Sequence, residues 1–122
     1  MITNEKSFLQ GDFTNFAEKN ETLYSLLIQF LNDNKDNEQI CVKLGQTELR
    51  LSQLAVAAQR VATSLTSYKL IAICMQPSFE FIITLCATII SGIPYIPIDP
   101  ILPFERIKYI LQDSQAQVIV TA

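Results

Sequence analysis

One segment of the chain, residues 70–98, restricts the fold more than any other. It begins with the apolar run LIAICM at residues 70–75, which is typical of a strand buried on both faces of a parallel sheet. Residues 79–91 carry apolar side chains on nearly all sides of a predicted helix, and residues 95–98 are a second short apolar run. Strand, helix and strand within about thirty residues form a βαβ crossover with parallel strands. The sequence therefore predicts an α/β fold with a mostly parallel sheet.

Capping and turn residues mark the ends of these elements. Ser78 is a predicted N-cap, Gly92 suits the left-handed position after a helix, and Pro94 prevents the helix from continuing. Pro97 cannot donate to a sheet ladder, so the second strand is predicted to be short or to lie at a sheet edge. Asp99 could be a catalytic carboxylate at the end of a strand. Because no second acid, base or metal ligand lies near it in sequence, turn capping is the preferred interpretation.

Helices and strands alternate along the remaining sequence. A helix with Thr22 as N-cap is predicted to end at the polar loop of residues 32–38. Residues 39–44 and 47–51 form a predicted hairpin, and Ser52 is the predicted N-cap of the amphipathic helix that follows.

The C-terminal part continues the alternation. Pro103 is predicted to lie in the first turn of a further helix, and residues 117–121 form a last strand. Side chains predicted to be buried on helix faces, or as core aromatics, are Leu23, Leu26, Leu27, Phe30, Leu31, Leu54, Ala55, Ala57, Ala58, Val61, Ala62, Leu65, Phe104, Ile107, Ile110, Leu111, Tyr24, Tyr95 and Tyr109.

The first 21 residues differ from the rest. They are polar with scattered phenylalanines, Phe8, Phe13 and Phe16, and without a sustained period, so residues 1–21 are predicted to be an irregular leader. A chain of 122 residues is too short for two comfortable domains. We therefore expect residues 22–122 to form one structural unit.

Composition excludes several classes of function. The 12 acids exceed the 9 bases and no basic patch is evident, so a nucleic-acid partner is not expected. Histidine is absent, which removes every triad, general base and metal site that needs an imidazole. Cys41, Cys74 and Cys86 lie far apart in apolar surroundings, and we expect them to be buried reduced thiols. An odd number of cysteines without an N-terminal signal indicates the cytosol.

A membrane span is the main alternative for residues 81–98, which carry no formal charge. The length is marginal, and Gly92, Pro94 and Pro97 lower its hydrophobicity or break a helix. A buried helix followed by a buried strand is the preferred interpretation, and no membrane partner is expected.

Motifs that would carry phosphate chemistry are missing. Neither a GxGxxG nor a GxxxxGK[ST] sequence occurs, and the 3 glycines are too few for a phosphate cradle. The serines lack a nucleophile-elbow context. Glu105, Arg106 and Lys108 could be interpreted as a phosphate clamp, but a helix face of alternating charge is usually solvated. No catalytic, cofactor-binding or metal-binding residue is therefore assigned.

Three stretches resemble a known family: TELRLSQLAVAAQRVATSL at residues 47–65, SGIPYIPIDPILPFERIKYIL at 91–111 and DSQAQVIVT at 113–121. They are similar to the beginning of the adenylation domain of nonribosomal peptide synthetases, within the adenylate-forming AMP-dependent synthetases and ligases. The Tyr-x-Pro-x-Asp-Pro and Pro-x-Glu-Arg sequences of the middle stretch resemble the peptide-synthetase branch. Leu51, the missing Gly-Asp turn before residue 70, and Ser91 in place of a frequent lysine depart from that pattern.

This resemblance implies the N-terminal portion of a longer ligase fold. In such enzymes the phosphate loop, the residues that hold adenine and ribose, and the lysine that contacts the acyl-adenylate all come later in the sequence. The resemblance therefore implies ATP and Mg²⁺ for a complete enzyme but no cofactor and no catalytic residue for residues 22–122.

Three hypotheses follow. The first is a truncated front piece of an ATP-dependent amino-acid or carboxylic-acid ligase, a scaffold that is inactive alone, self-associates through uncovered surfaces, and has the remainder of the domain or a complementary chain as its partner. The second is a non-catalytic binding module or one half of a split adenylation enzyme. The third is an unrelated small α/β domain. Which acid is activated cannot be predicted from these residues.

Overall fold

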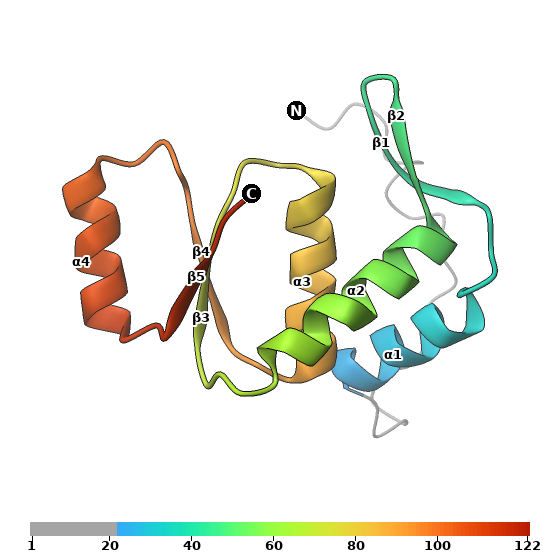
Figure 1. The fold of residues 1–122 in the computed structure, drawn as a ribbon, viewed down its shortest axis with the longest axis horizontal. Helices are drawn as coiled ribbons and strands as arrows, with labels where there is room; N and C mark the ends of the chain where they lie inside the picture. The colour runs from blue at the N-terminus through green and yellow to red at the C-terminus, as the bar shows by residue number, and fades with distance from the viewer. Residues whose placement is uncertain (1–21) are drawn as a thin grey trace, which may run out of the picture.

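The structure, a computed structural model, describes residues 22–122 (Figure 1). The predicted leader, with Phe8, Phe13 and Phe16, lies outside the described residues. The elements are, in chain order, α1 (Leu23–Asp33), β1 (Ile40–Leu44), β2 (Thr47–Arg50), α2 (Leu51–Leu65), β3 (Ile71–Cys74), α3 (Phe79–Ser91), β4 (Tyr95–Ile98), α4 (Phe104–Ser114) and β5 (Val118–Val120). The predicted alternation of helices and strands is confirmed.

A parallel sheet of strand order β4-β3-β5 lies at the centre of the molecule. Ile71 of β3 is level with Tyr95 of β4 and with Val118 of β5. The predicted βαβ crossover is therefore confirmed, with α3 as its helix. Strand β4 is at an edge of this sheet, as expected from Pro97, because that residue has no N–H to donate to a further strand.

The central strand β3 is the most deeply buried element. Ile71 and Ala72 have exposed fractions of 0% and Ile73 of 1%, so both faces of the strand are covered. Helices α3 and α4 lie on opposite sides of the sheet (Figure 1). Alternate strand residues point to opposite faces, so Ala72 faces away from Ile71 and Ile73. A strand that is buried on both faces needs apolar side chains at every position, which is why residues 70–75 include no polar residue.

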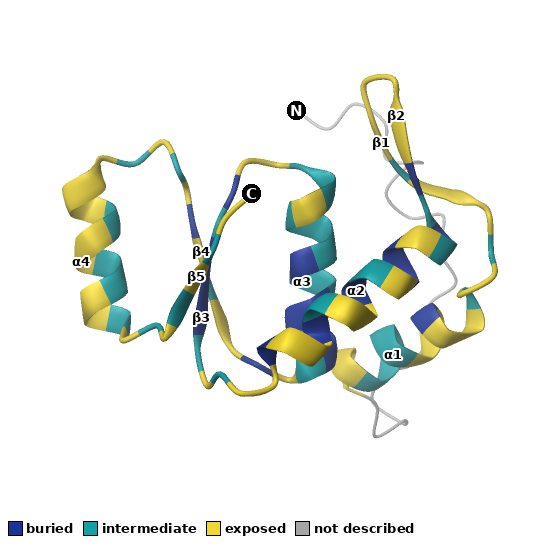
Figure 2. Ribbon diagram, viewed as in Figure 1, coloured by how far each residue is buried: buried dark blue, intermediate teal, exposed yellow. Residues whose placement is uncertain are grey.

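Helices α1 and α2 form a further layer against α3 (Figure 2). Ala55, Ala58 and Ala62 are buried on α2, and Ala87 is buried on α3. Small side chains allow the two helix backbones to approach closely, and the Oγ of Ser91 donates to the carbonyl oxygen of Ala62 across 3.3 Å. The predicted amphipathic face of α2 is confirmed.

The predicted ends of α1 and α3 are also confirmed. The N–H of Ser25 donates to Oγ1 of Thr22 at 3.1 Å, and the N–H of Thr22 donates to Oγ of Ser25 at 2.9 Å. At α3, the N–H of Phe81 donates to Oγ of Ser78 at 3.1 Å. Gly92 ends α3 in the left-handed conformation, with φ of 67°.

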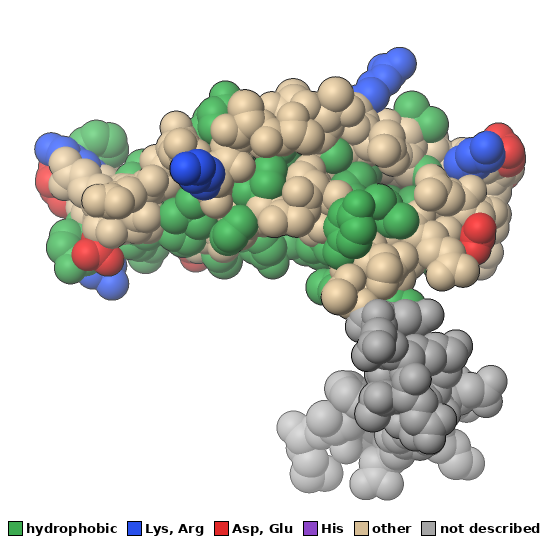
Figure 3. All heavy atoms as spheres, turned by 90° about the horizontal axis from the view of Figure 1, so that it is seen from below, with side chains coloured by type: hydrophobic (Ala, Val, Ile, Leu, Met, Phe, Trp, Pro, Cys, Tyr) green, Lys and Arg blue, Asp and Glu red, His purple; other side chains and the backbone are tan. Residues whose placement is uncertain are grey.

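Apolar surface remains between the ends of the molecule. On the face drawn in Figure 3, charged side chains lie mainly at the two ends, and apolar patches lie between them. Phe104 of α4 and Ile101 just before it have exposed fractions of 73% and 76%. Helix α4 contains no buried residue.

Several residues predicted to be buried are exposed. Tyr24, Tyr95 and Tyr109 lie on the surface, and so do Leu23 and Phe30 of α1 and Phe104 of α4. Ile107, Ile110 and Leu111 are only half-buried. A helical apolar stripe is buried only where a neighbouring element covers it, and the described elements cover α4 incompletely. The prediction of Phe104 and Tyr109 as core was wrong for that reason. It was also wrong for Leu23, Tyr24 and Phe30 of α1 and for Tyr95 of the edge strand β4.

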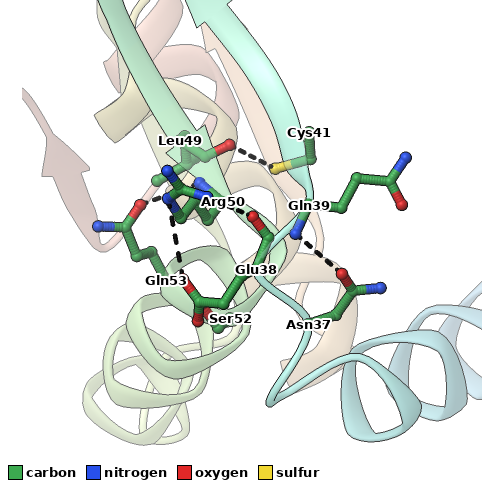
Figure 4. A network of polar contacts seen from close by, with 8 residues as sticks. All are labelled: Asn37, Glu38, Gln39, Cys41, Leu49, Arg50, Ser52 and Gln53. Carbon is green, nitrogen blue, oxygen red and sulfur yellow. Dashed lines mark hydrogen bonds and ion pairs between the residues drawn. The ribbon is translucent and has the colours of Figure 1, made fainter.

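Ser52 does not cap α2, because the helix already begins at Leu51 and its N-cap is Arg50 (Figure 4). The N–H of Leu51 donates to the carbonyl oxygen of Gln39 at 2.9 Å, and the N–H of Ser52 donates to that of Asn37 at 3.0 Å. Backbone carbonyls of the loop between α1 and β1 thus accept hydrogen bonds from N–H groups at the start of α2 that a side-chain cap would otherwise bind. The Oγ of Ser52 donates instead to Oε1 of Glu38 at 2.9 Å.

Arg50 also binds the loop between α1 and β1. Its Nη1 donates to the carbonyl oxygen of Glu38 at 2.6 Å, and its Nε lies 3.8 Å from the Glu38 carboxylate (Figure 4). Its backbone N–H donates to Oε1 of Gln53 at 2.9 Å. These contacts join the loop between α1 and β1 to the beginning of α2.

Within residues 22–122 no helix has the length and apolar character needed to cross a membrane. The stretch of residues 81–98 is divided between α3, a turn at Gly92 and β4. The helix and the strand of the preferred interpretation are confirmed, but the prediction that the strand is buried was wrong. Tyr95 and Pro97 are exposed, and of the four residues of β4 Ile98 alone is buried, because the strand lies at the edge of the sheet.

Gly92 provides a test of the helix end. A Cβ at this position would meet no other atom within 4 Å, so the cost of Gly92→Ala comes from the positive φ alone. We expect this change to lower the free energy of unfolding by about 1–2 kcal/mol in urea denaturation. Gly92→Asn is the control and should cost less, because asparagine tolerates the left-handed conformation. Equal losses from both changes would contradict this assignment.

Candidate functional site

The best candidate site is a hollow at the carboxyl ends of β3 and β4. Its volume is about 480 Å³. The residues that line it are Met75, Gln76, Pro77, Phe81, Pro97, Ile98, Asp99, Pro100 and Ile101. Open α/β sheets bind ligands outside the carboxyl ends of their strands, so the topology places this hollow where a ligand would be expected.

Asp99 is held in a turn at the edge of this hollow. Its Oδ1 accepts a hydrogen bond from the N–H of Ile101 at 2.9 Å, and its backbone oxygen accepts one from the N–H of Leu102 at 3.1 Å. These bonds are those of an Asx turn followed by a backbone turn. The predicted role of Asp99 as a turn cap is confirmed.

The lining of the hollow is mainly apolar. Of the described residues that form it, Asp99 is the one with an ionisable side chain, and none is a lysine or arginine. The Asp99 carboxylate repels a phosphate group, and no cation there balances it. No group of three or more potential metal-binding side chains occurs within residues 22–122. The described residues therefore do not fit a nucleoside triphosphate with Mg²⁺.

Sequence reasoning missed the hollow as a unit. Gln76-Pro77 and Asp99-Pro100 each follow a strand, and parallel strands that are neighbours end at the same edge of the sheet. Two polar-Pro pairs that follow neighbouring parallel strands could therefore have predicted the hollow from the sequence. The apolar character of the other lining residues pointed to a core instead.

The charged residues of α4 do not converge on a ligand site. Glu105, Arg106 and Lys108 are exposed. The guanidinium of Arg106 lies over the ring of Tyr109, 5.5 Å from its centroid, which is a cation–π distance. This arrangement agrees with a solvated helix face. That no residue of the chain is catalytic stays a prediction.

The three cysteines are free thiols, but they are not uniformly buried. Cys41 is exposed, which corrects the prediction for this residue, and Cys74 and Cys86 are half-buried. Cys41 lies on β1, whose partner is β2 alone, so one side of the hairpin faces solvent. The Sγ of Cys41 donates to the carbonyl oxygen of Leu49 at 3.2 Å. Burial raises the pKa of the Cys86 thiol, with a smaller contribution from Cys41.

A family model described as AMP-binding enzyme matches residues 31–122 of the chain. The chain belongs to the AMP-binding enzyme family. The match includes the whole of the parallel sheet and the hollow at its carboxyl ends. The resemblance of residues 47–65, 91–111 and 113–121 to this family is thereby confirmed.

Peptide synthetases are among the relatives of this AMP-binding family member. Phosphinothricin tripeptide synthetase PhsB of Streptomyces viridochromogenes is 42% identical over 79 residues, covering 61% of this chain and 7% of that protein. A mycosubtilin synthase protein of Bacillus subtilis is 31% identical over 126 residues, covering 97% of this chain and 5% of that protein. The chain thus spans a small part of the length of these relatives.

Solved structures share the fold. The N-terminal subdomain of Klebsiella oxytoca NpsA, in complex with 3-hydroxyanthranilyl-AMSN, has a TM-score of 0.67 at 17% identity, over 78% of this chain and 25% of that chain. The nonribosomal peptide synthetase FmoA3, in an alpha-methyl-L-serine-AMP bound form, has a TM-score of 0.70 at 22% identity, over 78% and 12%. These structures show the fold, and the family match and the sequence relatives together with them support an N-terminal adenylation-domain fragment.

Asp99 can be tested as a turn residue. Asp99→Ala removes the acceptor for the Ile101 N–H and should lower the free energy of unfolding by about 1 kcal/mol. Asp99→Asn keeps an acceptor oxygen and should cost clearly less. Urea denaturation of both variants checks this expectation, which fails if the asparagine variant is as unstable as the alanine variant.

Thiol reactivity tests the described environment of the cysteines. Because burial raises the pKa of Cys86, a smaller fraction of this thiol is ionised at pH 8 than of an ordinary cysteine. Cys86 is also less accessible to solvent than Cys41. Iodoacetamide should therefore modify Cys41 faster than Cys86 in the folded chain, as measured by mass spectrometry of peptides. In urea the two rates should converge. Faster modification of Cys86 in the folded chain would contradict the structure.

Proposed function

We propose that this chain is the front scaffold of an ATP-dependent ligase that activates an amino acid or another carboxylic acid as its adenylate, and that it is inactive by itself. The observation that carries the proposal is the hollow at the carboxyl ends of β3 and β4. It lies where an α/β sheet binds ligands, yet among the residues of 22–122 that line it Asp99 is the one with an ionisable side chain. A binding position without binding groups is what a supporting part of a larger site would provide.

The uncovered surfaces support the same proposal. Strand β5 is at an edge of the sheet, and its residues Val118, Ile119 and Val120 include neither a charge nor a proline that would protect an exposed edge. Helix α4 has no buried residue, and Phe104 and Ile101 are strongly exposed. Surfaces of this kind are stabilised when further protein covers them. The proposed partner is therefore the remainder of the adenylation domain.

ATP and Mg²⁺ belong to the proposed function of the complete domain. Residues 22–122 do not offer groups that fit them, so we assign no step of the reaction to these residues. Their contribution is to hold the carboxyl ends of the parallel strands in place. Without its partner, the chain is expected to self-associate through β5 and α4. The free thiols favour a cytosolic location.

One half of a split enzyme is the second candidate. The same exposed edge of β5 favours it, because a separate chain could pair there as well as a continuous one. Mixing this chain with a separately expressed remainder of an adenylation domain distinguishes the two. Recovery of activity on mixing supports a split enzyme, and recovery only when the parts are joined supports a scaffold within one chain.

The scaffold role predicts an outcome in ATP–pyrophosphate exchange. The isolated chain should show no exchange with any member of an amino-acid panel. Residues 22–122 grafted in place of the matching segment of an active adenylation domain should retain exchange within about tenfold, which is about 1.4 kcal/mol in activation free energy. Exchange by the isolated chain would refute the proposed inactivity.

The graft needs a matched control. Ala72→Arg places a charge in a strand position with an exposed fraction of 0% and should abolish exchange by disrupting the sheet. Lys43→Arg, on the exposed hairpin, should leave exchange unchanged. A graft that loses activity while its fold is intact would show that these residues are not an interchangeable scaffold.

A further inference from the structure

The two outer edges of the parallel sheet differ in the main-chain groups that they offer. Strand β3 lies between β4 and β5, so each of these two strands has one side with no strand beside it among residues 22–122. The N–H of Ile71 donates to the carbonyl oxygen of Pro94 at 3.2 Å, so the main-chain polar groups of Ile71 point toward β4. Those of the next residue, Ala72, point toward β5, because these groups alternate between the two sides of a strand.

Ile119 of β5 directs its N–H and C=O groups away from the sheet. It is level with Ala72 in the parallel register. In a parallel ladder, a residue bonds to the two residues that flank the one level with it, so Ala72 bonds to Val118 and Val120. Ile119, between them, therefore offers a donor and an acceptor on the side of β5 where the described residues place no strand.

The outer edge of β4 does not offer the same groups. Tyr95 and Pro97 are level with Ile71 and Ile73, the residues of β3 that bond to β4. By the same geometry, Tyr95 and Pro97 are the residues of β4 whose main-chain groups point outward. Pro97 has no N–H, which removes one of the two outward donors of this edge. The sheet can therefore gain a strand at β5 more readily than at β4.

The side chain of Ile119 lies on the less covered face of the sheet. Val118 and Val120 point to the opposite face, where they pack against the core cluster that includes residues of α3. Ile119 thus lies on the face of α4 (Figure 1), and its exposed fraction is 39%. Residues 117–121 carry no charge. Two copies of this edge can therefore approach each other without charge repulsion.

We propose that the isolated chain forms a dimer in which β5 pairs antiparallel with β5 of a second copy. The two-fold axis passes beside Ile119, the middle residue of Val118–Val120, so that the two short strands overlap fully. The N–H of each Ile119 donates to the carbonyl oxygen of the partner's Ile119, and the two isoleucine side chains meet on the face of α4.

Assembly stops at two chains. A two-fold axis uses the same edge of both copies, so the joined sheet has β4 at each of its ends. Pro97 weakens any further pairing there. The dimer rests on the proposed function, because it uses the edge of β5 that the remainder of an adenylation domain is proposed to cover. Dimerisation and completion of the domain therefore exclude each other.

Sedimentation equilibrium of the full chain tests the dimer. Over about a hundredfold range of protein concentration, we expect one reversible equilibrium between monomer and dimer. Ile119→Pro removes the outward donor but no bond to β3, and it should weaken dimerisation at least about tenfold. Ile119→Lys places two like charges opposite each other and should act in the same direction.

The other edge of the sheet provides the matched control. Tyr95 of β4 has an exposed fraction of 37%, close to that of Ile119. Tyr95→Lys should leave the dimerisation constant unchanged, because β4 lies outside the proposed interface. Thermal unfolding of each variant verifies that its fold is retained, and Ile119→Lys gives the result if the proline variant does not fold.

A fluorescence measurement provides an independent reading. The chain contains no tryptophan, so Ile119→Trp introduces a single reporter at the proposed two-fold axis. Its emission should shift to shorter wavelength as the protein concentration rises, because the indole becomes shielded in the dimer. The emission of Tyr95→Trp should not depend on concentration.

Three results would overturn the dimer. They are a monomer at every concentration, assemblies that grow beyond two chains, and equal weakening by Ile119→Lys and Tyr95→Lys. An emission of Ile119→Trp that does not depend on concentration would do the same. None of these measurements involves adenylation, so failure of the dimer is distinguished from failure of the proposed function, which ATP–pyrophosphate exchange tests.

Discussion

Burial of β3 on both faces is the constraint on which the rest of the structure depends. Ile71, Ala72 and Ile73 can be excluded from water only if strands pair on either side and a layer of helices covers each face. Strands β4 and β5 meet the first requirement. Helix α3, supported by α2, meets the second on one face, and α4 meets it incompletely on the other. The molecule is therefore well packed on one side of the sheet and less completely covered on the other.

This asymmetry is the link between the fold and the proposed function. The described residues form a scaffold that positions the carboxyl ends of the strands. The hollow at those ends is lined in part by the turn that Asp99 stabilises, but its described residues include no pair of groups that could activate a carboxylic acid. Membership of the AMP-binding enzyme family agrees with the proposed role of these residues as the scaffold of a ligase. Positioning is a large part of catalysis in such enzymes, so a scaffold can be essential without touching the substrate.

Local signals predicted much of this fold. The apolar run before Met75, the cap at Ser78 and the glycine at residue 92 act over a few residues, and each lies where it was expected. Predictions that depended on neighbours were less successful. Ser52 is not the N-cap of α2, because backbone carbonyls of the loop between α1 and β1 accept hydrogen bonds from the first N–H groups of the helix. Phe104 is exposed because none of the described elements covers it. Sequence patterns indicate which face is apolar, but they do not indicate whether another element is present to bury it.

Hydrogen exchange followed by mass spectrometry tests the central claim most directly. The account predicts that amides of β3 and α3 exchange slowest, and that amides of β5 and α4 exchange much faster in the isolated chain and slow down when the remainder of an adenylation domain is joined to it. Protection of β5 and α4 equal to that of β3 in the isolated chain would contradict the account, because it would show a finished domain rather than a scaffold.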